Sequence, residues 1–172
     1  MSREEPADTL WQALSFEKVD SIWKTDFVIA HTVCLARSLK HWTGHELLAG
    51  VSSPVELSQQ VFEAPFVVVS HGTEADPILN YGNRAALTLW EMSWEELTRT
   101  PSRLTAGAPS RGERARLLGA VTRRGFIDDY SGVRISKAGR RFRISRATVW
   151  NLLSKDGKPC GQAAMFDRWE LL

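Results

Sequence analysis

The chain has 172 residues, of which 43% are hydrophobic, and a formal net charge of +2. This length suits one domain with a core of its own and is too short for two ordinary domains. The sequence contains no apolar run of about 18 residues and no charged-then-apolar leader, so we expect neither a membrane span nor a signal peptide. Its two cysteines lie far apart in sequence, which is typical of a reduced, cytoplasmic protein.

Charge is distributed unevenly along the chain. Residues 1–98 carry 14 acidic and 6 basic side chains, whereas residues 99–146 carry 13 basic and 3 acidic ones. A basic segment of this kind can bind an anionic partner, or it can attract the acidic half within one fold. The sequence leaves both interpretations open.

The N-terminal part of the chain is predicted to be helical. Residues 7–42 favour two helices with a break near residues 24–26, where Thr25 or Asp26 can cap the second helix. Gly44 ends that helix. Its inward stripe recurs every three or four residues and consists of Val28, Thr32, Leu35, Leu39 and Trp42.

A third helix follows, with a well-defined start. Ser53 at the N-cap, Pro54 at the first helical position and Glu56 two residues later form a capping box reinforced by proline. This helix is expected to end near residue 63. We interpret residues 1–54 as an N-terminal helical extension and residues 55–172 as the main domain.

The middle of the chain alternates two short strands with short helices. Residues 66–71 form a continuous β-branched run, and residues 78–81 form a second strand after a turn. Asn83 then caps a short helix, and capping boxes beginning at Ser93 and Ser110 start two more.

The last third of the chain predicts a three-stranded antiparallel meander. Turns at residues 136–139 and 154–158 divide residues 125–169 into three runs rich in β-branched and aromatic residues. A two-residue turn at Asp156-Gly157 would place Asn151 opposite Gln162, and Trp150 opposite Ala163.

The middle strand of this meander has two apolar faces near its C-terminal end. Strict alternation puts Phe142, Ile144 and Trp150 on one face, and Ala147 and Val149 on the other. A sheet with one solvated face would alternate cleanly, so both faces must be covered. We therefore predict an α+β fold: a five-stranded antiparallel sheet with short helices on one face and the N-terminal helices on the other.

Three stretches resemble the MEKHLA domain, a PAS-related family of small stand-alone bacterial proteins and of plant transcription-factor C-termini. They are ILNYGNRAALTLWEMSWEEL, TRTPSRLTAGAPSRGERARLLGAV and GFIDDYSGVRISKAGRRFRISRATVWNLLSKDGKPCGQAAMFDRW. The resemblance covers roughly residues 55–170, and the N-terminal helices fit the short bacterial version. It implies a PAS-like fold with a sensory, ligand-binding or interaction role, in signalling or transcriptional regulation.

The resemblance also implies a pocket between the concave sheet face and the short helices at about residues 83–104. Nine aromatic and polar residues are expected around it: Asn80, Tyr81, Trp90, Arg103, Tyr130, Arg134, Arg146, Trp150 and Asn151. The alternative is an ordinary core with a satisfied hydrogen-bond network. Trp150 opposite the small Ala163 either fills the core or forms one wall of the pocket, and we predict the wall.

Light sensors of this superfamily hold flavin beside a reactive cysteine, within Asn-Cys-Arg-Phe-Leu. This chain has Pro101-Ser102-Arg103-Leu104 there, so a cysteinyl–flavin site is not expected, and the ligand stays unknown. A small-molecule ligand and a homodimer are the partners we consider, whereas a membrane is not expected.

Other functions have weaker motifs. An enzyme of small metabolites could use Asp128, Asp129 or a histidine, but adjacent strand residues point to opposite faces, so no catalytic residue is assigned. His71 at a strand end could ligate haem or simply be solvated, and no metal site is assigned. Nucleic-acid binding through residues 99–146 is not expected, because the arginines of residues 140–146 divide between two faces.

Overall fold

The structure is a computed structural model of the chain and describes residues 19–107 and 111–172. Residues 7–18 of the first predicted helix, and the N-cap predicted at Ser110, lie outside the described residues. The elements are η1 (Ile22–Lys24), α2 (Asp26–Thr43), α3 (Pro54–Phe62), β1 (Val67–His71), β2 (Leu79–Gly82), α4 (Arg84–Trp90), α5 (Trp94–Leu97), η2 (Ser102–Thr105), α6 (Arg111–Arg124), β3 (Phe126–Ile135), β4 (Arg141–Leu153), β5 (Pro159–Phe166) and β6 (Arg168–Leu171).

The helix boundaries in the N-terminal part follow from local capping. The Thr25 hydroxyl accepts a hydrogen bond from the Val28 N–H at 3.3 Å, and Gly44 ends α2 in a left-handed conformation with φ 74°. The Ser53 hydroxyl likewise accepts from the Glu56 N–H at 3.4 Å and starts α3. Both predicted helix starts are confirmed.

The six described strands form one antiparallel sheet in the order β2-β1-β5-β4-β3, and β6 pairs with β4. Asn151 lies opposite Gln162 and Trp150 opposite Ala163, so the predicted pairing is confirmed. The predicted two-residue turn is wrong: the Ser154 N–H donates to the Lys158 carbonyl oxygen across three residues, and an irregularity between Leu152 and Leu153 restores the register. The predicted last strand is divided at Asp167 into β5 and β6, both of which pair with β4. The antiparallel α+β class is therefore confirmed, with one strand more than the five expected.

A β-bulge interrupts the middle strand of the meander. Tyr130 pairs with Ala147 and Gly132 pairs with Ile144, so β4 advances three residues where β3 advances two. Arg146 lies in this extra step and has a left-handed backbone with φ 54°. One extra residue in a strand exchanges the faces of everything beyond it.

The bulge determines which side chains enter which core. Phe142 and Ile144, before the bulge, share the inner face with Val149 after it, whereas Trp150 and Leu152 face the opposite, outer side. Strict alternation had put Phe142 and Ile144 on the face of Trp150. That prediction is wrong because it assumed a regular strand, whereas β4 contains one extra residue at the bulge.

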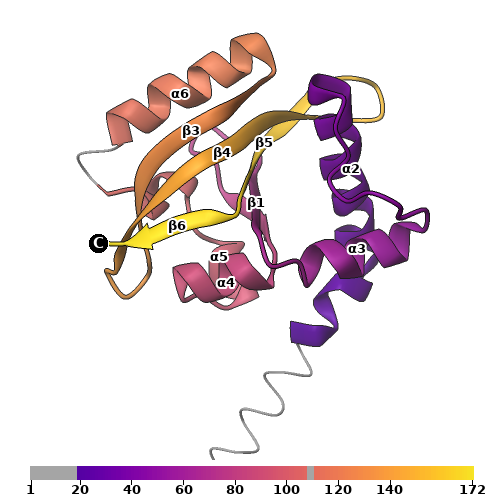
Figure 1. Ribbon diagram of the computed structural model, residues 1–172, viewed down its shortest axis with the longest axis horizontal. Helices are drawn as coiled ribbons and strands as arrows, with labels where there is room; N and C mark the ends of the chain where they lie inside the picture. The colour runs from indigo at the N-terminus through magenta and orange to yellow at the C-terminus, as the bar shows by residue number, and fades with distance from the viewer. Residues whose placement is uncertain (1–18, 108–110) are drawn as a thin grey trace, which may run out of the picture.

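Two helical layers cover the two faces of the sheet. On the outer face, α2 packs on β4 and joins a core that includes Leu35, Leu39, Val68 and Trp150. On the inner face, α4 and α6 pack over a second core that includes Trp90. Figure 1 shows α2 and α3 side by side on one side of the sheet and α6 alongside β3. The predicted arrangement of helices on both faces is confirmed.

The end of α2 is fixed against the meander at close range. The Trp42 indole N–H donates to the Asn151 carbonyl oxygen at 2.9 Å. At Gly125, which has φ 95°, a Cβ would lie 2.3 Å from the Trp42 ring. Only glycine provides both the left-handed backbone and the space.

Among the described helices, none has the length and apolar character needed to cross a membrane.

Candidate ligand cavity

A cavity of about 60 Å³ lies between the inner face of the sheet and the helices α4, η2 and α6. Ile144, Val149, Ala164 and Phe166 of β4 and β5 form its apolar wall. This volume is enough for a few water molecules or a few heavy atoms. Pockets for drug-sized ligands are larger, at about 300–1,000 Å³.

Arg134 and Tyr130 of β3 form one polar wall. Arg134 is only 7% exposed, and its guanidinium donates to the Tyr130 hydroxyl and, at 2.9 Å, to the Val133 carbonyl oxygen. The guanidinium also lies over the Tyr130 ring, 5.2 Å from its centroid. A Cβ at Gly132 would come within 2.6 Å of the Tyr130 hydroxyl oxygen, so glycine leaves room for this pair.

Arg114, in the first turns of α6, contributes a second guanidinium to the same cavity. It is half-buried and donates to the Ser102 hydroxyl of η2. Burial lowers the pKa of Arg114 to about 10, and the positive charge of Arg134 adds to this effect. Among the described residues, no ion pair includes Arg114 or Arg134.

His71 and Trp90 add polar atoms that have no partner among the described residues. His71 Nδ1 lies 2.8 Å from the Gly72 carbonyl oxygen, an acceptor, so Nδ1 carries the proton and Nε2 is left with a free lone pair. Burial lowers the pKa of His71, which keeps the ring neutral near pH 7. The Trp90 indole N–H is buried and unpaired, and both residues line the cavity.

Three of the nine predicted pocket residues line this cavity: Trp90, Tyr130 and Arg134. Two others, Trp150 and Tyr81, lie on the outer face, and for Trp150 the cause is the bulge, which turns the end of β4 away from the cavity. Trp150 is fully buried against α2 and donates its indole N–H to the Leu35 carbonyl oxygen at 3.2 Å. Tyr81 packs in the same outer core. The predicted pocket wall at Trp150 is thus corrected to a core position under the N-terminal helix.

The remaining four predicted residues have structural or surface positions. Asn80 accepts a hydrogen bond from Ser70 at 2.6 Å, and Asn151 bonds to Val121 and Gln162. Arg103 pairs with Asp76 at 3.2 Å, with 51% of its side chain exposed. Arg146 is exposed at the bulge.

Arg114, Ser102 and Gln162 line the cavity without having been predicted. A pattern that could have identified Arg114 is present in the sequence. It lies four residues before Leu118 and seven before Val121, at the spacing of one helix face that turns inward. The pattern is easily missed because Arg114 is charged, and arginine is rarely found on the buried face of a helix.

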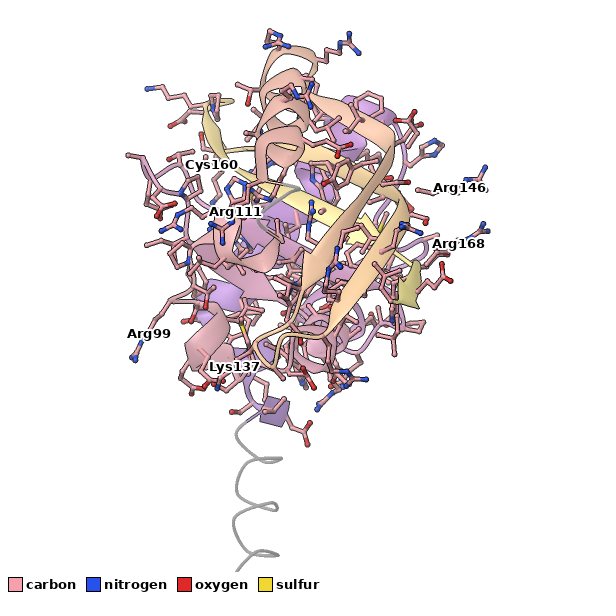
Figure 2. The ribbon with its side chains drawn as sticks, turned by 90° about the vertical axis from the view of Figure 1, so that its left-hand side faces the viewer. Arg99, Arg111, Lys137, Arg146, Cys160 and Arg168 are labelled. Atoms are coloured by element: carbon pink, nitrogen blue, oxygen red, sulfur yellow. The ribbon has the colours of Figure 1, made fainter. Side chains whose placement is uncertain are left out.

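Several basic side chains of residues 99–146 lie far apart or pair with acidic side chains. Figure 2 shows Arg99 and Arg146 pointing away from the body of the protein on opposite sides of the view. Lys137 pairs with Glu96, and Arg140 pairs with Glu91. Each of these pairs joins the basic segment to a carboxylate of the acidic first half of the chain.

The cavity residues do not fit a photoactive cysteinyl–flavin. Neither Cys34 nor Cys160 lines the cavity, since both pack against the outer core beside α2. The cavity is also much smaller than a flavin requires. Within residues 19–107 and 111–172, no group of three or more His, Cys, Asp or Glu side chains could hold a metal ion.

Comparison with solved structures shows what fold this is. The PAS domain of a protein from Colwellia psychrerythraea has a TM-score of 0.55 at 14% identity, with 68% of this chain and 94% of that chain covered. An RNA-binding light-oxygen-voltage receptor has a TM-score of 0.59 at 17% identity, with 72% of this chain and 36% of that chain covered. A light-oxygen-voltage domain studied with a flavin analogue has a TM-score of 0.54 at 15% identity, with 68% of this chain and 84% of that chain covered. The fold is that of PAS domains.

No curated protein matches the chain. The MEKHLA domain family matches residues 29–171, from within α2 to the last residue of β6. This match covers most of the chain and includes all six described strands. The chain belongs to the MEKHLA domain family.

Proposed function

We propose that this protein is a non-enzymatic sensory module that binds a small ligand in the cavity between the inner sheet face and α4, η2 and α6. The observation that supports this most directly is the composition of the cavity. An apolar wall faces a cluster of partly unpaired polar groups, Arg114, Arg134, His71 and Trp90. Small-molecule sites combine apolar walls with a few placed polar groups in this way.

The position of the cavity also suits a sensor. Its lining comes from five strands and three helices, including η2 and α6 on either side of residues 108–110. A ligand that contacts elements so far apart in sequence can favour one arrangement of them over another. The signal would then pass to a partner or to a second copy of the chain.

The test compares the small molecules that co-purify with three forms of the full chain. Ala164→Leu fills the cavity from β5, whereas Ala115→Leu adds the same side chain at an exposed position of α6. Mass spectrometry of the denatured proteins should find a compound released by the wild type and by Ala115→Leu, and depleted in Ala164→Leu. Equal amounts from all three folded proteins would contradict a ligand in this cavity.

A further inference from the structure

The cavity contains two cations that its walls do not neutralise. Arg134 is nine-tenths buried, yet among the described residues it donates only to the neutral Tyr130 hydroxyl and the Val133 carbonyl oxygen. Arg114 has a serine hydroxyl as its described partner. A guanidinium has five N–H donors, so each of these two side chains has N–H groups left that can bind a ligand. Buried charges in proteins are normally paired, because leaving them unpaired is costly.

The two cations are also close enough to repel each other. The charge of Arg134 is one of the causes, after burial, that lower the pKa of Arg114. Both side chains line the same small cavity, one from β3 and one from α6. An anion placed between them would compensate the burial of each guanidinium and remove their mutual repulsion.

The neutral polar atoms of the cavity add a pattern of donors and acceptors. The Trp90 N–H is a third donor without a partner among the described residues. His71 Nε2 is an acceptor, since Nδ1 donates its proton to the Gly72 carbonyl oxygen. Such a set matches a ligand with several acceptor oxygens and one hydroxyl.

We infer that the cavity binds a small oxyanion, a carboxylate or a phosphate, between Arg114 and Arg134. The Trp90 N–H donates a third hydrogen bond to it, and His71 Nε2 accepts one from a hydroxyl of the ligand. The inference rests on the proposed function and adds the chemical class of the ligand. The volume of about 60 Å³ limits that ligand to a few heavy atoms.

The test titrates the full chain with sodium phosphate, acetate or lactate and follows the thermal unfolding temperature. Sodium chloride at equal ionic strength controls for screening. The unfolding temperature of the wild type should rise saturably with at least one of the three oxyanions. Arg114→Met should weaken the apparent affinity about tenfold or more, as expected for the loss of a charge-assisted contact.

The control variant is Arg116→Met, which removes the same charge at an exposed position two residues along α6. It should respond to the anions as the wild type does. In chloride alone, Arg114→Met should unfold at the wild-type temperature or above, because it removes a repelled cation. A purely structural Arg114–Ser102 contact would instead make this variant less stable at every anion concentration.

A second readout does not depend on the stability of any variant. The indole N–H resonance of Trp90, identified by its loss in Trp90→Phe, should shift as the oxyanion saturates the wild-type protein. If this resonance does not move, or if Arg114→Met and Arg116→Met respond alike, the oxyanion site is overturned. If Ala164→Leu nevertheless depletes a neutral compound that co-purifies with the wild type, the proposed ligand-binding function stands without the oxyanion site. If Ala164→Leu depletes no compound, the proposed function and the oxyanion site are both wrong.

Discussion

His31 on α2 couples the stability of the protein to pH. Its Nε2 lies 2.8 Å from the Ser70 hydroxyl oxygen, which donates its own proton to Asn80, so Nε2–H is the donor. Burial lowers the pKa of His31 from 6.5 to about 4, which keeps the ring neutral in the folded protein. Between these two values the unfolded chain binds more protons than the folded chain, so stability falls as the pH falls.

We expect the free energy of unfolding to drop by up to about 3 kcal/mol between pH 7.5 and pH 4 on account of His31. His31→Gln keeps a donor for Ser70 but does not titrate, so its stability should depend less steeply on pH. Urea unfolding of both proteins at several pH values measures this. His71, whose pKa is also lowered, contributes equally to both and cancels in the difference. Parallel profiles would contradict the assignment.

Cys160 of β5 should be a slowly reacting thiol. Burial raises its pKa to about 11, and the neighbouring Cys34 contributes to the shift. Because the thiolate is the reactive form, alkylation by iodoacetamide at pH 7.5 should be far slower than for a free cysteine, and should accelerate when urea unfolds the chain. Peptide mass spectrometry after timed quenching gives the rate at each cysteine. An equally fast reaction in the folded and the unfolded protein would contradict this.

At the scale of elements, the contact between α2 and the meander has one critical position. Gly125→Ala brings a Cβ to 2.3 Å from the Trp42 ring on a backbone with φ 95°. Overpacking of this kind costs about 1–3 kcal/mol, in addition to the cost of the left-handed backbone. Chemical denaturation should show this loss of stability.

The control for that loss is Gly139→Ala, which has a similar φ of 86° and nothing within 4 Å of the added Cβ. It should lose only the backbone contribution, about 1–2 kcal/mol. In a double-mutant cycle, Trp42→Leu should relieve part of the cost of Gly125→Ala but none of the cost of Gly139→Ala. Additive effects at Gly125 would show that the ring is not the cause.

Elements and their pairing could be predicted from the sequence because their causes are local. Thr25, Ser53 and Gly44 fix helix ends through neighbouring backbone groups, and the polar, glycine-containing run at residues 154–158 marks the turn between β4 and β5. The cavity could be predicted only in part, because its geometry depends on irregularities in β3 and β4 that no local pattern indicates. No glycine or proline near Arg146 indicates the extra residue in the sequence. This residue nevertheless determines that Trp150 faces the outer core.

At the scale of the whole molecule, the N-terminal helices form part of the domain's core. Val68, Trp150 and Leu152 are fully buried beneath α2. Removing residues 1–50 should therefore expose several hundred Å² of contiguous apolar surface, a patch size typical of aggregation or interaction sites. Size-exclusion chromatography with light scattering should find the truncated chain aggregated. A soluble monomer as stable as the full chain would contradict this view of α2.

The bulge at Arg146 has a consequence for how this sheet tolerates change in sequence length. Substitutions there, including Arg146→Gly, keep the count of residues and leave both cores in place. Deleting one residue at this point would exchange the two faces of the strand from Ala147 onward, so that Trp150 would enter the cavity and Val149 would meet α2. In relatives that share both packed layers, the spacing between Ile144 and Ala147 should therefore stay constant, while this residue should vary among those that tolerate a left-handed backbone, such as Gly and Asn.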